Sequence, residues 1–175
     1  EGEAWVTMKK PGNLLSVPGR GSEKVDSVLT RVRTFHPRGA SAETAHRLDF
    51  ETSGVQLIAL SSPANSALQT QFVKRETEKT YLAWIEGIPP EAAGTIDAPI
   101  RQIDRHIRGH EIHPDGKPAQ TSYSVLGQRD GWTLLALRPR TGRTHQLRVH
   151  CAQSPLLGYP IVGDPLYGSG REALF

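Results

Sequence analysis

The carboxylate of Asp49 is the first group in this sequence that could carry a reaction. Asp49 ends the run His46-Arg47-Leu48-Asp49, two positions after an arginine, and Thr52-Ser53-Gly54 follows shortly. A nearby opposite charge favours the ionised carboxylate, which is the form that a nucleophile requires. A helix cap or a structural ion pair would use the same residues, so the motif by itself leaves both interpretations open.

A second polar cluster covers residues 140–150. Three arginines, two histidines and a glutamine fall within these eleven positions. Guanidinium groups bind phosphate or carboxylate as a rigid fork, and glutamine can hydrogen-bond a base edge or the backbone. This composition is typical of an anion-binding segment, although a solvated, charged strand remains the alternative.

The histidines do not have the spacing of a metal site. Glu111 follows His110, but the next histidine is His113, one position too early for His-Glu-x-x-His, and Cys151 is the single cysteine. The sequence also lacks the phosphate loop of nucleotide-binding proteins and the Gly-x-Ser-x-Gly turn of serine hydrolases. We therefore expect no metal and no cofactor.

Composition and charge indicate an ordinary globular protein with a polyanionic partner. Residues 1–100 hold 11 Lys/Arg against 12 Asp/Glu, whereas residues 101–148 hold 9 against 4. Such a basic block favours nucleic acid. The 175 residues fit one domain, no apolar run approaches a membrane helix, and a single cysteine cannot form an internal disulfide. These features predict a cytoplasmic protein without a membrane partner.

Hydrophobic periodicity predicts two helices. The first covers residues 26–35, with Ser22 as its cap, and the second begins at the cap Ser62 and Pro63 and ends at about Lys74. The apolar face of the first helix would consist of Val25, Val28, Leu29, Val32 and Phe35, and that of the second of Ala64, Ala67, Leu68, Gln71 and Phe72.

Strands are predicted at residues 5–8, 55–60, 81–86, 121–126 and 132–137, the last two joined by a hairpin loop at 127–131. Residues 146–150 could form a helix or a strand. Two helices among several strands, without regular βαβ alternation, predict an α+β fold with a mostly antiparallel, mixed sheet and flanking helices.

Taken together, these segments resemble the RluA-type family of pseudouridine synthases. The resemblance follows the family's order along nearly the whole chain, and its two strongest motifs, at 46–54 and 142–150, lie about 95 residues apart. The other matching segments are Lys10-Pro11-Gly12, Leu15-Ser16-Val17-Pro18-Gly19, Gln71-Phe72, Lys79-Thr80-Tyr81-Leu82-Ala83, Gly116-Lys117-Pro118-Ala119-Gln120-Thr121 and Gly163-Asp164-Pro165-Leu166-Tyr167-Gly168.

The resemblance implies an isomerase that turns uridine in RNA into pseudouridine without a cofactor. It implies that Asp49 is the catalytic carboxylate, that Tyr81 lies against the target base and that Arg143 pairs with the aspartate. Arg47 would fill the base stack when the uridine is flipped out. Further RNA-binding or base-flipping residues would be His46, Leu147, Arg148, Arg105 and Arg108, with segment 101–113 as a loop that reaches into RNA.

The same resemblance predicts a structured RNA as the partner, an rRNA or tRNA stem-loop, and a monomeric protein. The chain would be a single catalytic domain over residues 1–175, without the small S4-type RNA-binding domain of many relatives. Family members continue past Gly-Asp-x-x-Tyr-Gly into a further strand and helix, so we expect a C-terminal tail to be lost here, because the sequence stops at Phe175.

Two other functions fit parts of the sequence. An RNA-binding module could keep the charged segment without catalysis, although Asp49, Tyr81 and Arg143 are all present. An unrelated hydrolase could pair Asp49 with His145, but it would need a second acid or base that the sequence does not identify.

Overall fold

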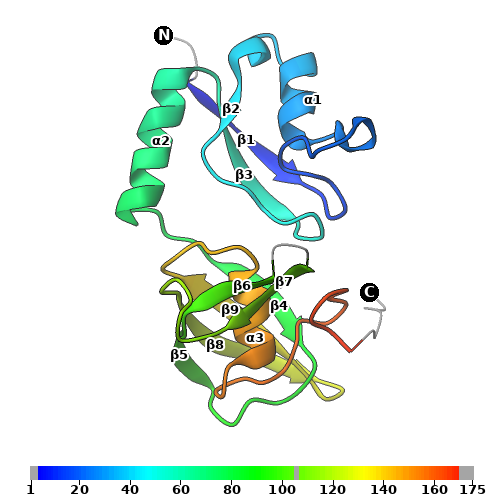
Figure 1. Cartoon of the computed structure of the whole chain (residues 1–175), viewed down its shortest axis with the longest axis vertical. Helices are drawn as coiled ribbons and strands as arrows, with labels where there is room; N and C mark the ends of the chain where they lie inside the picture. Colours follow the sequence, from blue (N-terminus) through cyan, green and yellow to red (C-terminus); the bar gives the residue numbers. More distant parts are fainter. Residues whose placement is uncertain (1–3, 105–106, 170–175) are drawn as a thin grey trace. The chain divides into compact units, whose positions relative to one another are not determined.

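The computed structural model describes residues 4–104 and 107–169. The chain divides into two compact units, Glu1–Thr77 and Glu78–Phe175 (Figure 1). Each unit has its own sheet and its own cluster of buried apolar side chains. The expectation of a single domain over residues 1–175 stays a prediction.

The first unit contains a three-stranded antiparallel sheet and two helices. The strands are β1 (Trp5–Lys10), β2 (Glu43–Thr44) and β3 (Gly54–Ala59), in the order β1-β3-β2. The helices are α1 (Val28–Phe35) and α2 (Ser62–Lys74), and two short 3-10 turns lie at Ser22–Lys24 and Gly39–Ser41.

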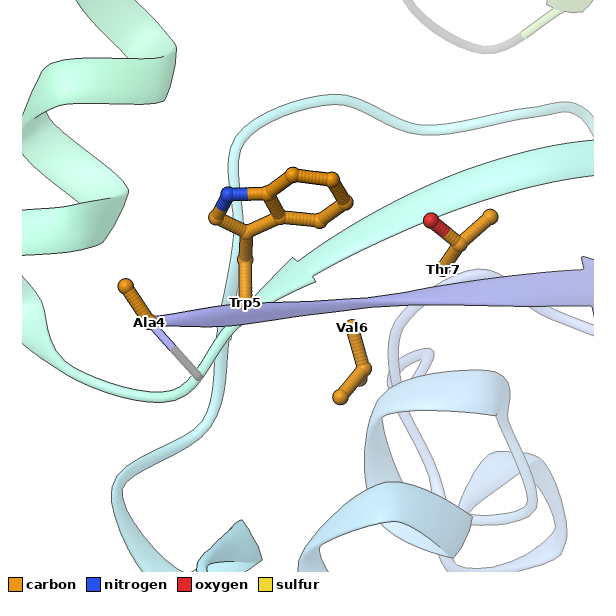
Figure 2. Close-up of a pocket in the computed structure, with 4 residues that line it drawn as sticks. All are labelled: Ala4, Trp5, Val6 and Thr7. Carbon is orange, nitrogen blue, oxygen red and sulfur yellow. The ribbon is translucent and has the colours of Figure 1, made fainter. Parts of the chain in front are cut away.

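Strand β1 turns alternate side chains to opposite faces of this sheet. Trp5 and Thr7 lie on one side and Val6 on the other, beside a pocket along the strand (Figure 2). Val6 packs against the core of the unit, whereas Trp5 is 47% exposed. This alternation is the period-two pattern of a strand with one face towards the core, and the strand predicted at residues 5–8 is present as β1.

Helix α1 is shorter than its periodicity indicates. Val28, Leu29 and Val32 are buried against β3 as predicted, but Val25 and Phe35 are 51% and 81% exposed. The helix begins late because Ser27, and not Ser22, is its cap: the Ser27 hydroxyl accepts a hydrogen bond from Thr30 N at 3.1 Å. Val25 therefore precedes the helix, and Phe35 ends it on the solvent side.

Helix α2 has the predicted extent, but its cap lies one residue earlier, at Ser61. Ala64, Leu68 and Phe72 are partly buried, and Asn65 is the buried residue of the helix. Ala67 and Gln71, which the periodicity assigned to the inner face, are exposed. The inner face is thus narrower than predicted.

The second unit contains a four-stranded antiparallel sheet, a separate two-stranded hairpin and one helix. The sheet has the order β4-β9-β8-β5, and β6 pairs with β7. The elements are β4 (Tyr81–Ile85), β5 (Ala93–Asp97), β6 (Ile100–Asp104), β7 (Ile107–Ile112), β8 (Gln120–Arg129), β9 (Trp132–Pro139) and α3 (Gln146–Gln153).

Three predictions for this unit need correction. Strands β5, β6 and β7 were missed, and segment 101–113, expected to be a loop, lies mostly within the β6–β7 hairpin. The β8–β9 loop is shorter than 127–131, because β8 continues past an irregularity at Val125/Gly127. The turn itself is Asp130-Gly131, both at positive φ (52° and 81°), as a tight two-residue hairpin turn requires.

Helix α3 joins the sheet and the hairpin. Its Cys151 packs with Ile85 and Leu137 of the sheet, and its Val149 packs with Ile100 of the hairpin. Burial raises the pKa of the Cys151 thiol to about 12, so this cysteine stays protonated and acts as a small apolar residue. Antiparallel sheets flanked by helices confirm the predicted α+β class.

No helix within residues 4–104 and 107–169 is long and apolar enough to cross a membrane.

We expect Gly116→Ala to destabilise the second unit. A Cβ at this position would lie 2.6 Å from the Ile100 carbonyl carbon and 2.7 Å from the Ile100 nitrogen, so backbone would have to move. The free energy of unfolding should fall by about 1–3 kcal/mol. Gly127→Ala is the matched control, since its Cβ would meet nothing within 4 Å. Urea denaturation of both variants measures the difference, and equal midpoints would contradict the prediction.

Candidate functional site

Asp49 lies in the first unit, on the loop between β2 and β3. Its side chain is partly buried, between exposed Arg47 two positions before and exposed Phe50 directly after. Thr52 N donates a hydrogen bond to Asp49 O at 3.2 Å, which turns the chain back towards β3. The loop therefore presents Arg47 to solvent and holds Asp49 partly sheltered.

The residue before Asp49 is fixed by Ser16. The buried Ser16 hydroxyl donates to Leu48 O at 2.7 Å and accepts from Leu48 N at 2.9 Å. Leu48 itself is buried. One side chain thus satisfies both backbone groups of Leu48, and the chain direction leading into Asp49 is set.

The residue after Asp49 is fixed by Lys10. The fully buried Lys10 ammonium donates to three carbonyls: Leu14 O at 2.7 Å, and Pro11 O and Phe50 O at 3.0 Å. Burial lowers the pKa of Lys10, and the charges of Glu51 and Asp49 act in the opposite direction. Both neighbours of Asp49 are therefore tied through their backbone to residues 10–16.

His46 is used within the first unit. Its Nε2 accepts a hydrogen bond from Leu57 N at 3.0 Å, and its ring stacks on Phe72 of α2 with centroids 4.8 Å apart. These contacts link the start of the Asp49 loop to β3 and α2. The predicted RNA contact of His46 stays a prediction.

Tyr81 and Leu147 pack against the same apolar cluster of the second unit. Tyr81 begins β4 opposite Leu137, and Leu147 lies in α3. Both are partly buried against the apolar cluster that contains Ile85 and Leu137. An aromatic ring and an aliphatic side chain are therefore both partly exposed at the edge of this cluster, and groups of this kind suit contact with a flat, uncharged base.

Arg143 lies on the loop before α3, and Gln146 holds that loop. The Oε1 atom of Gln146 accepts from Arg143 N at 3.0 Å and from Thr141 Oγ1 at 2.7 Å. Its Nε2 donates to Gln120 O at 3.0 Å and to Thr121 Oγ1 at 2.9 Å. Gln146 is buried and is used by the protein itself rather than by a base edge. The Arg143 guanidinium donates from Nε to Pro118 O at 3.0 Å.

His145 adopts the left-handed conformation (φ 56°) ahead of α3. Its Nδ1 lies 2.9 Å from the Tyr167 hydroxyl, which also accepts from His110 N at 2.8 Å. Tyr167 therefore connects the loop of Arg143 with the β6–β7 hairpin. Tyr167 belongs to the predicted Gly163–Gly168 motif, but no role was predicted for it from the sequence.

Arg148 forms a bidentate pair with Asp164. Nε and Nη2 of Arg148 lie 2.6 and 2.8 Å from the two carboxylate oxygens, and the side chains are only 12% and 3% exposed. Asp164 also accepts from Leu166 N and Tyr167 N at 2.9 Å. The Arg148 guanidinium lies 5.2 Å from the centre of the Tyr167 ring. Arg148 thus orders the segment after α3 through Asp164.

Two predicted RNA-binding residues, Arg105 and Arg108, come from segment 101–113. Arg108 belongs to β7, whereas Arg105 lies outside the described residues. In the part of the chain that the structure describes, no three His, Cys, Asp or Glu side chains gather as ligands for a metal ion.

The pairing with Arg148 predicts an acid-sensitive stability. Burial would raise the pKa of Asp164, but the hydrogen bonds from Arg148, Tyr167 N and Leu166 N outweigh it and lower the pKa. The contribution of this carboxylate is therefore complete above its unfolded pKa of about 3.9 and is lost as the pH falls through the lower folded pKa. Asp164→Asn should lower the unfolding midpoint at pH 7 and remove this part of the acid dependence.

Urea unfolding at a series of pH values tests this prediction. Asp130→Asn is the control, because the Asp130 side chain is 81% exposed on a hairpin turn. The prediction fails if Asp164→Asn retains the acid dependence of the parent.

Comparison with known proteins agrees with the resemblance seen in the sequence. The family model for RNA pseudouridylate synthase matches residues 4–153. The dual-specificity RNA pseudouridine synthase RluA of Escherichia coli K12 is 43% identical over 166 residues, which cover 94% of this chain and 73% of the relative. An uncharacterized RNA pseudouridine synthase of Zymomonas mobilis is 38% identical over 174 residues, covering 98% of this chain and 78% of the relative.

Among solved structures, human RNA pseudouridylate synthase domain containing 1 superposes with a TM-score of 0.78 at 30% identity, covering 98% of this chain and 69% of that chain. A Cbf5-Nop10-Gar1 complex, at 20% identity and a TM-score of 0.52, shares the fold alone. With a family model that matches most of its length and relatives above 40% identity, this chain belongs to the RNA pseudouridylate synthase family.

Proposed function

We propose that this chain converts uridine in structured RNA to pseudouridine, with Asp49 as the catalytic carboxylate. Membership of the family and the 43% identity to a pseudouridine synthase support the reaction. The observation that carries the assignment of Asp49 is the loop around it. Ser16 and Lys10 fix the backbone on both sides of Asp49, while its side chain stays partly open to solvent.

The proposed reaction is an isomerisation in which all atoms are retained. The C1′–N1 bond of uridine breaks, the uracil turns, and a C1′–C5 bond forms; C5 loses a proton and N1 gains one. Asp49 either adds to C1′ or removes a proton from the sugar. Both routes use the carboxylate directly, and neither needs a metal or a redox cofactor.

The target base must leave the RNA stack before the carboxylate can reach its sugar, which costs a few kcal/mol. We assign Arg47 to fill the vacated place, because its side chain is exposed next to the Asp49 loop. Tyr81 would stack on the uracil, a contact of about 1–3 kcal/mol, and Leu147 would exclude water. Arg143 would supply the positive charge that partners the carboxylate during the reaction.

Two of the predicted RNA-binding residues act indirectly in this proposal. His46 positions the Asp49 loop through Leu57 N and Phe72, and Arg148 orders the segment around Tyr167 through Asp164. Arg105 and Arg108 are proposed to contact RNA, because both belong to the basic part of the sequence.

An rRNA or tRNA stem-loop is the proposed substrate, and a cytoplasmic monomer the proposed form. The excess of Lys and Arg over Asp and Glu in residues 101–148 supports a structured RNA as the substrate, because its phosphates lie close together. Mapping pseudouridine in RNA from cells with and without this protein identifies the target. A binding module without catalysis would retain RNA affinity but leave every uridine unchanged.

Asp49→Asn should abolish turnover while RNA binding survives, because shape and size hardly change. We expect the single-turnover rate to fall by at least about 100-fold and the RNA dissociation constant to stay within about threefold. Glu76→Gln is the matched control, an exposed carboxylate of the first unit outside this loop, and should keep its activity. A rate for Asp49→Asn within tenfold of the parent would reject Asp49 as the essential group.

Arg47→Ala should weaken base flipping more than RNA affinity. Loss of the side chain that fills the stack is expected to slow single turnover by on the order of tenfold or more, with a smaller change in the dissociation constant. Arg20→Ala removes another exposed arginine of the first unit and serves as the control. A fluorescent base analogue at the target position reports flipping directly. Equal flipping in Arg47→Ala and the parent would exclude the proposed role.

A further inference from the structure

A groove with cationic walls lies in the second unit, between the β6–β7 hairpin and the loop before α3. Its volume is about 410 Å³, within the usual range of small-ligand sites. Arg101, Lys117 and Arg143 supply its positive charge, and Asp115 is its acidic side chain. His110, Gly142 and Thr144 contribute to the remaining wall. The groove is therefore suited to an anion rather than to an apolar group.

The three cations are not equivalent. Arg101 faces Glu111 across the hairpin, with Nε and Nη2 at 2.9 and 2.8 Å from Glu111 Oε1, and Asp115 lies 3.9 Å from its Nη1. The charge of Arg101 is thus largely offset by protein carboxylates. Among the described residues no carboxylate forms an ion pair with Lys117. Arg143 is the cation proposed above to partner Asp49 during the reaction, so the charge of the groove that is left for another ligand is that of Lys117.

The backbone that carries Lys117 is held firmly. Lys117 N donates to Ile100 O at 2.8 Å, and Ile100 N donates to Lys117 O at 3.0 Å. Gly116 packs so closely on Ile100 that a side chain there would collide with backbone. The next residue, Pro118, accepts from the Arg143 guanidinium at 3.0 Å. Lys117 and Arg143 therefore reach the groove from backbone segments that are joined to each other.

We propose that this groove binds a backbone phosphate of the RNA, with Lys117 as the cation that contacts it. The inference rests on the proposed function, since that function supplies the RNA. An ammonium that lacks a carboxylate partner gains most from a phosphate, whose binding also releases counterions. Asp115 opposes any anion in the groove, but its side chain is 81% exposed, so solvent weakens the repulsion.

Lys117 provides the test, because it has no part in the proposed chemistry. RNA binding is measured over a series of salt concentrations for the parent, Lys117→Gln and Lys117→Arg. Lys117→Gln should weaken binding on the order of tenfold at low salt and reduce the salt slope by about one. Lys117→Arg should restore both. Arg129→Gln, at the end of β8 and paired with Asp130, is the control and should match the parent.

A set of stem-loop RNAs locates the contact. Each RNA carries one neutral methylphosphonate linkage near the target uridine. The methylphosphonate at the contacted position should weaken RNA binding by the parent. The same linkage should not weaken RNA binding by Lys117→Gln any further, because that variant has already lost the contact. Additive losses at every linkage would overturn the proposal, as would an unchanged salt slope. The groove could instead bind only free phosphate. The parent would then bind inorganic phosphate and Lys117→Gln would not, but no methylphosphonate linkage would affect the two proteins differently. This result also counts against the proposal.

The same RNAs separate this inference from the proposed function. If the parent forms pseudouridine while Lys117→Gln binds and reacts like the parent, only the phosphate groove is rejected. If the parent binds RNA and forms no pseudouridine, the proposed function is rejected. Urea midpoints confirm that Lys117→Gln is folded, which is expected because the Lys117 side chain is exposed.

Discussion

The buried ammonium of Lys10 is the interaction on which the Asp49 loop depends. A charge removed from water is costly unless its hydrogen-bonding capacity is filled. An ammonium has three donors, and Lys10 directs them at three backbone carbonyls, of which Phe50 O belongs to the loop that carries Asp49. Asp49 and Glu51 add favourable charge. Moving the loop away would leave a buried cation short of an acceptor, so the loop position follows from the burial of Lys10.

The second unit uses the same principle with different groups. The side-chain amide of Gln146 makes four hydrogen bonds within the protein and thereby fixes the segment that carries Arg143. The pair of Arg148 and Asp164 orders Tyr167, whose hydroxyl meets both His145 and the β6–β7 hairpin. Many polar residues of the functional motifs are thus buried and satisfied within the protein. Those left with exposed side chains, such as Arg47 and Lys117, are the ones suited to meet a substrate.

The sequence allowed the fold class, five strands and the helices α1 and α2 to be predicted, because period-two and period-3.6 apolar patterns are local. Strands β5 to β7 were missed because polar and charged residues, such as Arg101 and Glu111, interrupt the alternation of apolar and polar side chains. The roles of His46 and Arg148 could not be predicted either. Their partners, Phe72 and Asp164, lie 26 and 16 positions further along the chain, and only tertiary structure brings them into contact. A motif identifies which side chains matter, but burial decides whether each one serves the fold or the ligand.

The proposed reaction explains why so much of the structure fixes loops. An isomerase without a cofactor has no reactive group except its own side chains, so its rate depends on positioning. The detached uracil must also stay in place while it turns, because the product is formed from the same base. Contacts to the base cannot all be kept during that rotation. The RNA backbone on either side does not rotate, and phosphate contacts there can hold the substrate throughout the reaction. This requirement favours rigidly mounted cations beside the reacting nucleotide, and Lys117, held to Ile100 by two backbone hydrogen bonds, has the mounting that such a role needs.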